Sequence, residues 1–241
     1  MKFLLSGEGP TDIGLRGYGG IFVHGPMTLF IDRLVEPILG YSARQIEVEP
    51  EDILEFCSRQ ELMDRGKTKV VKFAGKKFGK GRAYFTANAQ ALGSLAVQRS
   101  QSERCPYVAI LFRDGDGTRS RDEWEVKRTS IERGFALGGH RYGVPMVPRP
   151  KSEAWLLQAH SDHDTPHVTY EAMTGSRESA YDVKQMLAEL VGNPSREHLV
   201  ELIDDGIIDP FAISDACTSF RTFKDVLEEK VQAALTLDRR G

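Results

Sequence analysis

Residues 107–118 read YVAILFRDGDGT, and they give the strongest indication of the fold. Its apolar run ends at alternating acids and glycines, which is the pattern of a buried strand followed by a loop. The start of the chain repeats the pattern, because an apolar run at residues 3–5 leads into the acidic segment 8–12. In α/β sheets, ligand-binding groups gather beyond the carboxyl ends of such strands. The sequence therefore predicts that the two acidic segments meet at one edge of a sheet.

Strand and helix patterns alternate along the rest of the chain. Further strands are expected at residues 2–5, 45–48 and 142–147, with a short helix or strand at 52–56. The spacing of apolar residues predicts helices at 26–39, 85–98, 121–136, 153–159, 179–191 and 221–237. Pro26 suits a first helical turn, Gly40 a helix end and Ser152 an N-cap. The glycine-rich segment 14–25 is typical of a loop.

The order of these elements predicts an α/β fold, in which a mostly parallel sheet is flanked by helices on both faces. We expect residues 1–160 to form the sheet domain, with a basic insert at about residues 65–82. Residues 161–241 are expected to form a helical C-terminal extension that packs on the same core.

Composition narrows the class of protein. The chain has 241 residues, 40% of them hydrophobic, and a net charge of −3. Nucleic-acid binding would therefore have to come from a local patch, since the whole-chain charge does not favour it. The three cysteines are isolated, which argues against a disulfide framework or a structural zinc site and favours a cytoplasmic protein. No run approaches the roughly 18 apolar residues of a membrane span, so no membrane partner is expected.

The acidic segments carry the candidate chemistry. Asp114 and Asp116 are two positions apart, so their carboxylates point to the same side if the backbone stays extended. If Glu8 ends the neighbouring strand, three carboxylates face one point and can hold Mg²⁺ or Mn²⁺, which prefer hard oxygen ligands. Asp12 could orient a metal-bound water or cap the next segment. The simpler interpretation is that both segments are surface turns, in which Asp and Gly are common.

At these positions the sequence resembles a known family. An apolar strand followed by Glu-Gly-x-Thr-Asp, and a later one followed by Asp-x-Asp, is similar to the Toprim domain. Topoisomerases, bacterial primases, the small ribonuclease that matures 5S ribosomal RNA, and overcoming-lysogenization-defect (OLD) nucleases share that domain. The match covers residues 1–150 and implies that Glu8 is a general acid/base or metal ligand and that Asp114 and Asp116 hold Mg²⁺. The glycine-rich insert departs from the Toprim pattern and bears on how Asp12 is oriented.

Two later segments narrow the resemblance. Residues 148–157 (PRPKSEAWLL) and 219–223 (SFRTF) are similar to a stand-alone, Toprim-related bacterial family, whose members often occur in phage-defence or mobile-element contexts. Similarity to the nuclease branch implies that Glu153 joins the metal site and that Arg149 or Lys151 faces the scissile phosphate. From the residues alone, Glu153 could equally be a first-turn acid favoured by the helix dipole, and Lys151 a solvated side chain.

The most basic segment, residues 65–82, contains no acid and is interleaved with glycine and two phenylalanines. Its candidate phosphate-binding side chains are Lys67, Lys69, Lys72, Lys76, Lys77, Lys80 and Arg82. This composition suits a flexible arm along a nucleic-acid backbone, with salt-sensitive binding and a phenylalanine stacked on an unpaired base. A solvated loop is the alternative interpretation.

These features predict a metal-dependent nuclease that hydrolyses DNA or RNA with Mg²⁺ or Mn²⁺. One alternative is a non-catalytic Toprim-like module that binds nucleic acid or a partner ATPase, and the sequence leaves a homodimer open. Another is a haloacid-dehalogenase-type phosphatase, whose first motif the DGDGT sequence resembles. There Asp114 would be the nucleophile and Asp116 the acid, with Lys184 and the pair Asp204-Asp205 as later motifs. Against it, that motif normally stands near the start of its domain, and residues 199–203 look helical.

Overall fold

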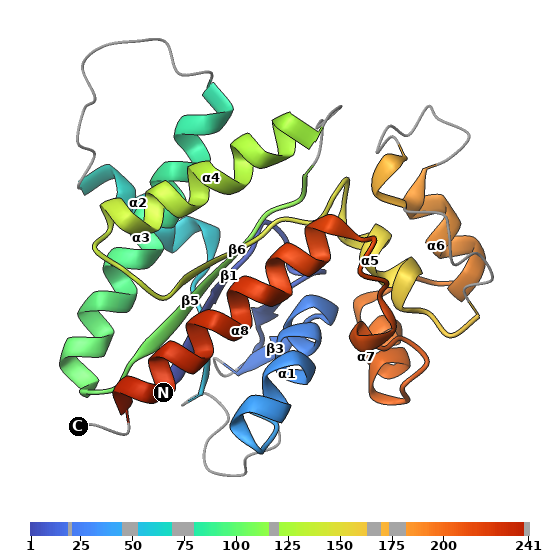
Figure 1. The fold of residues 1–241 in the computed structure, drawn as a ribbon, viewed down its shortest axis with the longest axis horizontal. Coiled ribbons are helices and arrows are strands. Elements are labelled where there is room, and N and C mark those ends of the chain that lie inside the picture. The colour runs from blue at the N-terminus through green and yellow to red at the C-terminus, as the bar shows by residue number, and fades with distance from the viewer. Residues whose placement is uncertain are drawn as a thin grey trace.

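The computed structural model describes residues 1–18, 21–44, 53–68, 80–115, 121–162, 170–173 and 182–238, with the backbone alone at 66–68, 80–82 and 238. Within these residues, four parallel strands form one sheet in the order β4–β1–β5–β6 (Figure 1). They are β1 (Lys2–Ser6), β4 (Leu54–Phe56), β5 (Tyr107–Phe112) and β6 (Gly143–Met146). The helices are α1 (Pro26–Leu39), α2 (Arg59–Thr68), α3 (Lys80–Glu103), α4 (Arg121–Leu137), α5 (Ser152–Ala159), α6 (Val183–Val191), α7 (Arg196–Asp204) and α8 (Thr218–Asp238). The predicted α/β class is confirmed.

The two central strands, β1 and β5, are direct neighbours although β4 lies between them in the chain. Ser6 of β1 pairs with Leu111 of β5. The chain winds outward from β1 to β4, returns across β1 to β5, and continues to β6. This reversal makes a topological switch point between β1 and β5, which is where ligands bind in open α/β sheets. Both acidic segments follow these two strands.

Alternate side chains of β5 divide the core into two layers. Val108, Ile110 and Phe112 belong to the apolar cluster that includes α1 and α8. Ala109 and Leu111 belong to the cluster that includes α3 and α4, with α2 packed beside α3. Figure 1 shows these two sets of helices on opposite faces of the sheet. Because both faces are covered, β5 is apolar throughout instead of alternating.

The C-terminal helix packs on the same apolar cluster as the sheet. Trp155 of α5 is fully buried, stacks on Phe223 of α8 at 5.5 Å between ring centroids, and lies edge-on to Phe220 at 5.2 Å. Its Nε1 donates to Ser219 Oγ at 2.9 Å. The buried Glu171 carboxylate accepts from the Ser219 N–H at 2.6 Å, one of the donors that a helix N-terminus leaves open. α8 then runs back along β5 and β6 (Figure 1).

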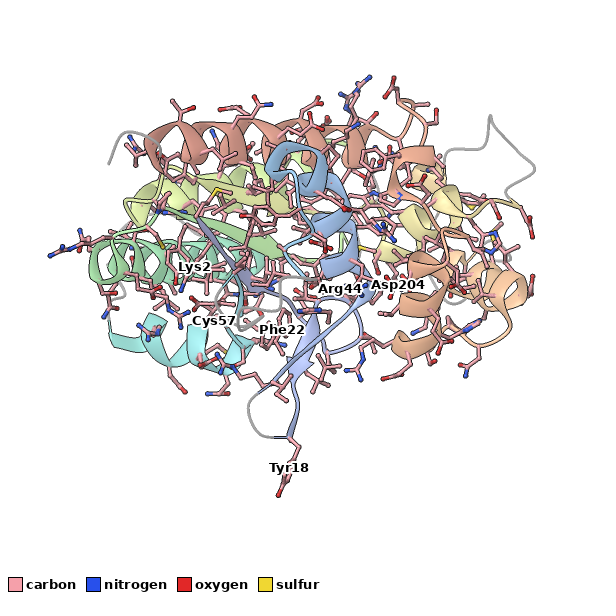
Figure 2. The ribbon with its side chains drawn as sticks, turned by 90° about the horizontal axis from the view of Figure 1, so that it is seen from below. Lys2, Tyr18, Phe22, Arg44, Cys57 and Asp204 are labelled. Atoms are coloured by element: carbon pink, nitrogen blue, oxygen red, sulfur yellow. The ribbon has the colours of Figure 1, made fainter. Side chains whose placement is uncertain are left out.

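The glycine-rich segment at residues 14–25 is not the loop that its composition predicted. It contains an antiparallel pair of short strands, β2 (Gly14–Arg16) and β3 (Phe22–His24). Gly14 has a φ of +118°, and a Cβ there would come 2.1 Å from the Val23 carbonyl oxygen. The glycine therefore lets the two strands approach closely instead of marking irregular chain. Figure 2 shows Tyr18 projecting from the tip of this hairpin.

Other expectations have mixed outcomes. Helix α1 has Pro26 in its first turn and ends at Gly40, whose φ is +81°, as the sequence predicted. The choice left open at residues 52–56 is resolved as strand β4. The strand expected at 45–48 lies outside the described residues. Among the helices that the structure describes, none has the length and apolar character needed to cross a bilayer.

Candidate functional site

The carboxyl edge of the sheet places Asp114 beside the segment that leads into α5. Pairing between β5 and β6 continues past both strands. The Arg113 N–H donates to the Met146 carbonyl at 3.0 Å, and the Gly115 N–H donates to the Pro148 carbonyl at 3.0 Å. Asp114 is therefore fixed between two backbone hydrogen bonds at the end of the central strand.

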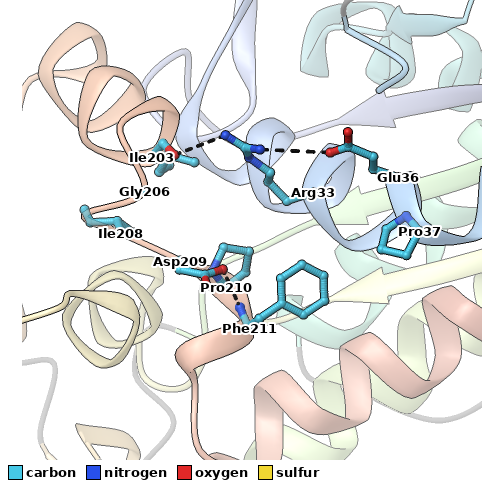
Figure 3. A pocket seen from close by; sticks show the side chains of 9 residues that line it. All are labelled: Arg33, Glu36, Pro37, Ile203, Gly206, Ile208, Asp209, Pro210 and Phe211. Carbon is cyan, nitrogen blue, oxygen red and sulfur yellow. Dashed lines mark hydrogen bonds and ion pairs between the residues drawn. The ribbon is translucent and has the colours of Figure 1, made fainter. Parts of the chain in front are cut away.

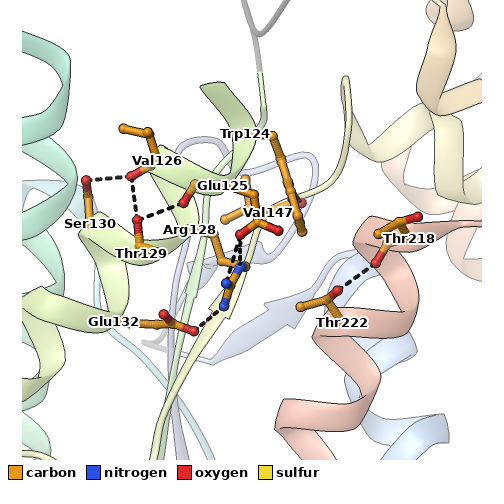
Figure 4. A network of polar contacts seen from close by, with 10 residues as sticks. All are labelled: Trp124, Glu125, Val126, Arg128, Thr129, Ser130, Glu132, Val147, Thr218 and Thr222. Carbon is orange, nitrogen blue, oxygen red and sulfur yellow. Dashed lines mark hydrogen bonds and ion pairs between the residues drawn. The ribbon is translucent and has the colours of Figure 1, made fainter. Parts of the chain in front are cut away.

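Helix α4 fixes the path of the neighbouring segment. Trp124 is buried, and its Nε1 donates to the Val147 carbonyl at 2.7 Å (Figure 4). One turn along α4, Arg128 forms ion pairs with two glutamates of the same helix (Figure 4). Arg149 and Lys151, the predicted phosphate-facing cations, lie two and four positions after Val147, and both side chains are half-buried.

Ser152 links two of the predicted metal-site acids. Its backbone N–H donates to Asp114 Oδ1 at 3.0 Å, and its hydroxyl donates to Asp12 Oδ1 at 2.7 Å. The same hydroxyl lies 3.5 Å from Glu153 Oε2. The N-cap prediction for Ser152 is wrong, because Lys151 holds the N-cap position and Ser152 is the first residue of α5. Its hydroxyl therefore serves Asp12 instead of its own helix, and one buried serine hydrogen-bonds to an acid that follows β1 and to an acid that follows β5.

The pKa of Glu153 is raised in this environment. Burial raises the pKa of the Glu153 carboxyl, and the negative charge of Asp12 raises it further. Lys184 and Lys151 act in the opposite direction on that pKa. The negative charges of Asp12 and Glu153 repel each other in this partly buried position. A bound cation would reduce that repulsion.

Glu8 lies against a residue that the sequence patterns missed. Glu8 Oε1 is 3.3 Å from Nε of Arg113, whose side chain is fully buried, while the Glu8 side chain is 38% exposed. Arg113 directly precedes Asp114, so the ion pair places Glu8 next to the end of β5. The only signal in the sequence was a charged residue that continues an otherwise apolar strand.

Other predicted site residues are not brought together by the described structure. No three His, Cys, Asp or Glu side chains among the described residues lie close enough to hold a metal ion. Asp116 lies outside those residues, so its place in a metal site stays a prediction. The same holds for Lys69, Lys72, Lys76 and Lys77, while only the backbone is described for Lys67 in α2 and for Lys80 and Arg82 in α3.

A surface pocket lies away from this edge, between α1 and the chain that follows α7 (Figure 3). Its volume is about 340 Å³, and its lining includes Glu36, Pro37 and Phe211. Arg33 borders it and donates to the Asp204 carbonyl at 3.4 Å. None of the predicted metal-site acids lines the pocket, so it is a separate feature from the carboxyl edge.

Asp204, which the phosphatase interpretation assigned to a later motif, lies at the end of α7 and not at the carboxyl edge of the sheet. Asp204 ends helix α7 and pairs with Arg44 at 2.5 Å, as labelled in Figure 2. Residues 199–203 are helical, as the sequence indicated, and do not form the strand that such a motif requires. The later phosphatase motif therefore has no strand end to project from.

Replacing the linking serine tests how firmly Asp12 is held. Ser152→Ala is expected to lower the free energy of unfolding by about 1.5–3 kcal/mol, because a buried hydrogen bond to a charged group is lost. The backbone bond to Asp114 survives the change. Urea unfolding measures the loss, with the exposed Ser161→Ala as the matched control, expected within about 0.5 kcal/mol of wild type. Equal effects in the two variants would mean that the hydroxyl does not secure Asp12.

The described geometry offers a set of hard oxygen donors at a switch point, flanked by cations from two segments. Asp12, Asp114 and Glu153 share one hydrogen-bonding partner, and Glu8 is paired with Arg113 on the adjoining strand end. Carboxylate oxygens suit Mg²⁺ or Mn²⁺ better than softer metals, but no three acids among the described residues converge on one point. Comparisons of the chain with protein-family models, with curated proteins and with solved structures find no significant match.

Proposed function

We propose that this chain is a metal-dependent nuclease of the Toprim class that hydrolyses phosphodiester bonds in DNA or RNA. The observation that carries the proposal is the link through Ser152, which joins an acid 140 positions earlier in the chain to one 38 positions earlier. Such a convergence at a topological switch point is the usual setting for a ligand site in an α/β sheet. A turn that served only to reverse the chain would not need acids from two strands.

The proposed roles follow from chemistry and position. Asp114, Asp12, Glu153 and the sequence-predicted Asp116 would hold Mg²⁺ or Mn²⁺. When bound, such an ion polarises a phosphoryl oxygen and lowers the pKa of a coordinated water. Glu8, which follows the neighbouring strand β1, would accept a proton from the attacking water or complete the ligand set.

Arg149 and Lys151, which precede α5, would bind the phosphate of the substrate. Arg149 and Lys151 flank the approach to α5 and are half-buried, so their charges are less screened than those of fully exposed side chains. Placed beside a phosphodiester, they would offset the negative charge that develops on the transferring phosphate. The basic segment 65–82 would supply sequence-independent contacts with the nucleic-acid backbone. Phage defence or mobile-element biology is the setting that the family resemblance suggests.

Two observations favour a second candidate, a non-catalytic module that binds nucleic acid or a partner ATPase. No three metal-ligating side chains converge among the described residues, and Ser152 already satisfies oxygens of Asp12 and Asp114. Under this interpretation the acids serve to anchor α5, and the carboxyl edge is a binding surface.

Cleavage assays of the isolated full chain separate the two candidates. We expect single- or double-stranded DNA or RNA to be cut in the presence of Mg²⁺ or Mn²⁺ and to stay intact with excess EDTA. Retention of labelled substrate without cleavage, under every metal condition, would support the binding module instead. Cleavage that persists at full rate in EDTA would contradict the metal-dependent proposal.

A further inference from the structure

A group of buried donors lies at the carboxyl end of the sheet, on the face that α2 and α3 cover. Side chains alternate along β5, so Arg113 points to the same face as Leu111, which packs with α3 and α4. Ser6 pairs with Leu111 in register and lies on that face too. Tyr84 and Asn88 are one turn apart on α3 and share a side of the helix. The Tyr84 ring centroid is 5.9 Å from the Arg113 guanidinium, so the helix meets the strand end here.

These buried side chains have unused hydrogen-bonding capacity. Arg113 Nη1 donates to the Phe112 carbonyl at 2.6 Å, whereas Nε and Nη2 make no hydrogen bond within the described residues. The same holds for the Tyr84 hydroxyl, Asn88 Nδ2 and Ser6 Oγ. Buried polar groups are almost always satisfied, and water or an ion does so where the protein offers no partner. The group is therefore a set of donors that a ligand rich in acceptors would complete.

The charge of the group favours an anion as that ligand. Arg113 is fully buried, and a guanidinium stays protonated in proteins. Burial lowers the pKa of the guanidinium, Tyr84 and Glu8 raise it, and Arg59 lowers it. Arg59 begins α2, is exposed to solvent and lies over the Tyr84 ring at 5.3 Å. Glu8 offsets one of the two positive charges, and the other attracts an anion more strongly than a water molecule.

We propose that this group binds a phosphate oxyanion, with Arg113, Arg59 and Tyr84 as its direct donors. Glu8 Oε1, 3.3 Å from Arg113 Nε, occupies the position that a phosphate oxygen would take. The Glu8 side chain is 38% exposed, and turning it toward the solvent would leave two guanidinium groups facing the ligand. Phosphate suits the position better than a carboxylate, because its four oxygens accept from several sides and arginine can bind it through two parallel hydrogen bonds. The inference needs neither a metal ion nor cleavage, so it stands apart from the proposed function.

Titration of inorganic phosphate into the full chain tests the proposal, with isothermal titration calorimetry as the readout and chloride added to keep the ionic strength constant. We expect saturable binding by wild type, and Arg113→Met should raise the Kd about tenfold or more, because hydrogen bonds to a charged group are lost. Glu8→Gln should lower the Kd, because it removes the carboxylate that competes with phosphate for Arg113. Arg128→Met removes a cation that pairs with acids on α4, and should leave the Kd unchanged.

Tyr84→Phe separates phosphate binding from a structural role. The Tyr84 hydroxyl has no hydrogen-bonding partner within the described residues, so its loss should leave the melting temperature without phosphate unchanged or slightly higher. The same variant should raise the Kd for phosphate about fivefold or more, because one donor to the anion is lost. Tyr41→Phe makes the same change at a position 42% exposed and should alter neither quantity. If Arg113→Met does not fold by circular dichroism, Tyr84→Phe and Glu8→Gln carry the test.

Two results would overturn the proposal. One is wild-type protein that shows no saturable binding of inorganic phosphate at millimolar concentration. The other is binding whose Kd stays at the wild-type value in Tyr84→Phe and in Glu8→Gln, since phosphate would then be held elsewhere.

The free ion and the terminal phosphate of a nucleic-acid strand share this chemistry. A 5′-phosphorylated oligonucleotide and the same oligonucleotide without the phosphate distinguish them, each competed against inorganic phosphate with EDTA present to prevent metal-dependent cleavage. Displacement by the phosphorylated strand alone would assign the site to a terminal phosphate. Displacement by neither strand would assign it to the free ion.

Discussion

Asp114→Asn is expected to lower Mg²⁺-dependent cleavage at least about 100-fold while the protein stays folded. Asparagine keeps the Oδ1 acceptor for the Ser152 N–H, which is 3.0 Å away, so the contact at the start of α5 survives. The substitution removes the negative charge that would hold the cation. Metal assistance contributes several kcal/mol to such reactions, and about 1.4 kcal/mol corresponds to a tenfold change in rate.

The control for this prediction is Asp225→Asn, which makes the same chemical change at an exposed position on α8. Cleavage of labelled single- and double-stranded substrates is followed at several Mg²⁺ concentrations, with thermal melts for both variants. We expect the control to match wild type in rate and in melting temperature. Equal cleavage by Asp114→Asn and wild type would contradict a catalytic role. A severe loss of stability would indicate that Asp114 mainly anchors the helix.

Trp155→Ala is expected to have the largest effect on stability. The ring is fully buried between α5 and α8, stacks on Phe223 and donates a hydrogen bond to Ser219. Truncating a buried tryptophan usually costs about 3–5 kcal/mol. For a chain of this length, that loss lowers the melting temperature by roughly 10 °C. Far-UV circular dichroism during urea unfolding measures the change.

The same experiment tests the expected packing of residues 161–241 on the core of residues 1–160. Trp155→Phe keeps the apolar ring and loses the Nε1 donor, so it should fall between wild type and the alanine variant. Leu237→Ala, at a position 46% exposed on α8, is the surface control. A loss below 1 kcal/mol for Trp155→Ala, or a separate early transition for the C-terminal helices, would contradict a shared core.

The parts of the fold that local patterns encode were predictable. The six apolar residues of β5 signal a strand covered on both faces, and Pro26 and Gly40 bracket α1 by their backbone preferences. The hairpin at β2 and β3 was missed because glycine is common both in loops and where two strands approach closely. A glycine that permits close approach of strands, as Gly14 does, has the same local signature as a glycine in a loop.

The contacts within the candidate site were only partly predictable from the sequence. Polar segments after β1 and β5 could be expected to meet once the sheet was assumed parallel. The role of Ser152 could not, because its partner Asp12 is 140 positions away and helix rules predicted that the hydroxyl caps its own helix. Arg113 was missed for a related reason. Only the tertiary fold reveals that this charged residue is buried and that Glu8 lies against it.

We propose that acids following β1 and β5 share one cation, and anomalous diffraction from crystals soaked in Mn²⁺ would locate that cation. We expect a Mn²⁺ peak bounded by a carboxylate oxygen of Asp114 and by one from Asp12 or Glu8. A saturating soak that leaves this edge without a peak, or that places Mn²⁺ only on acids elsewhere, would contradict it.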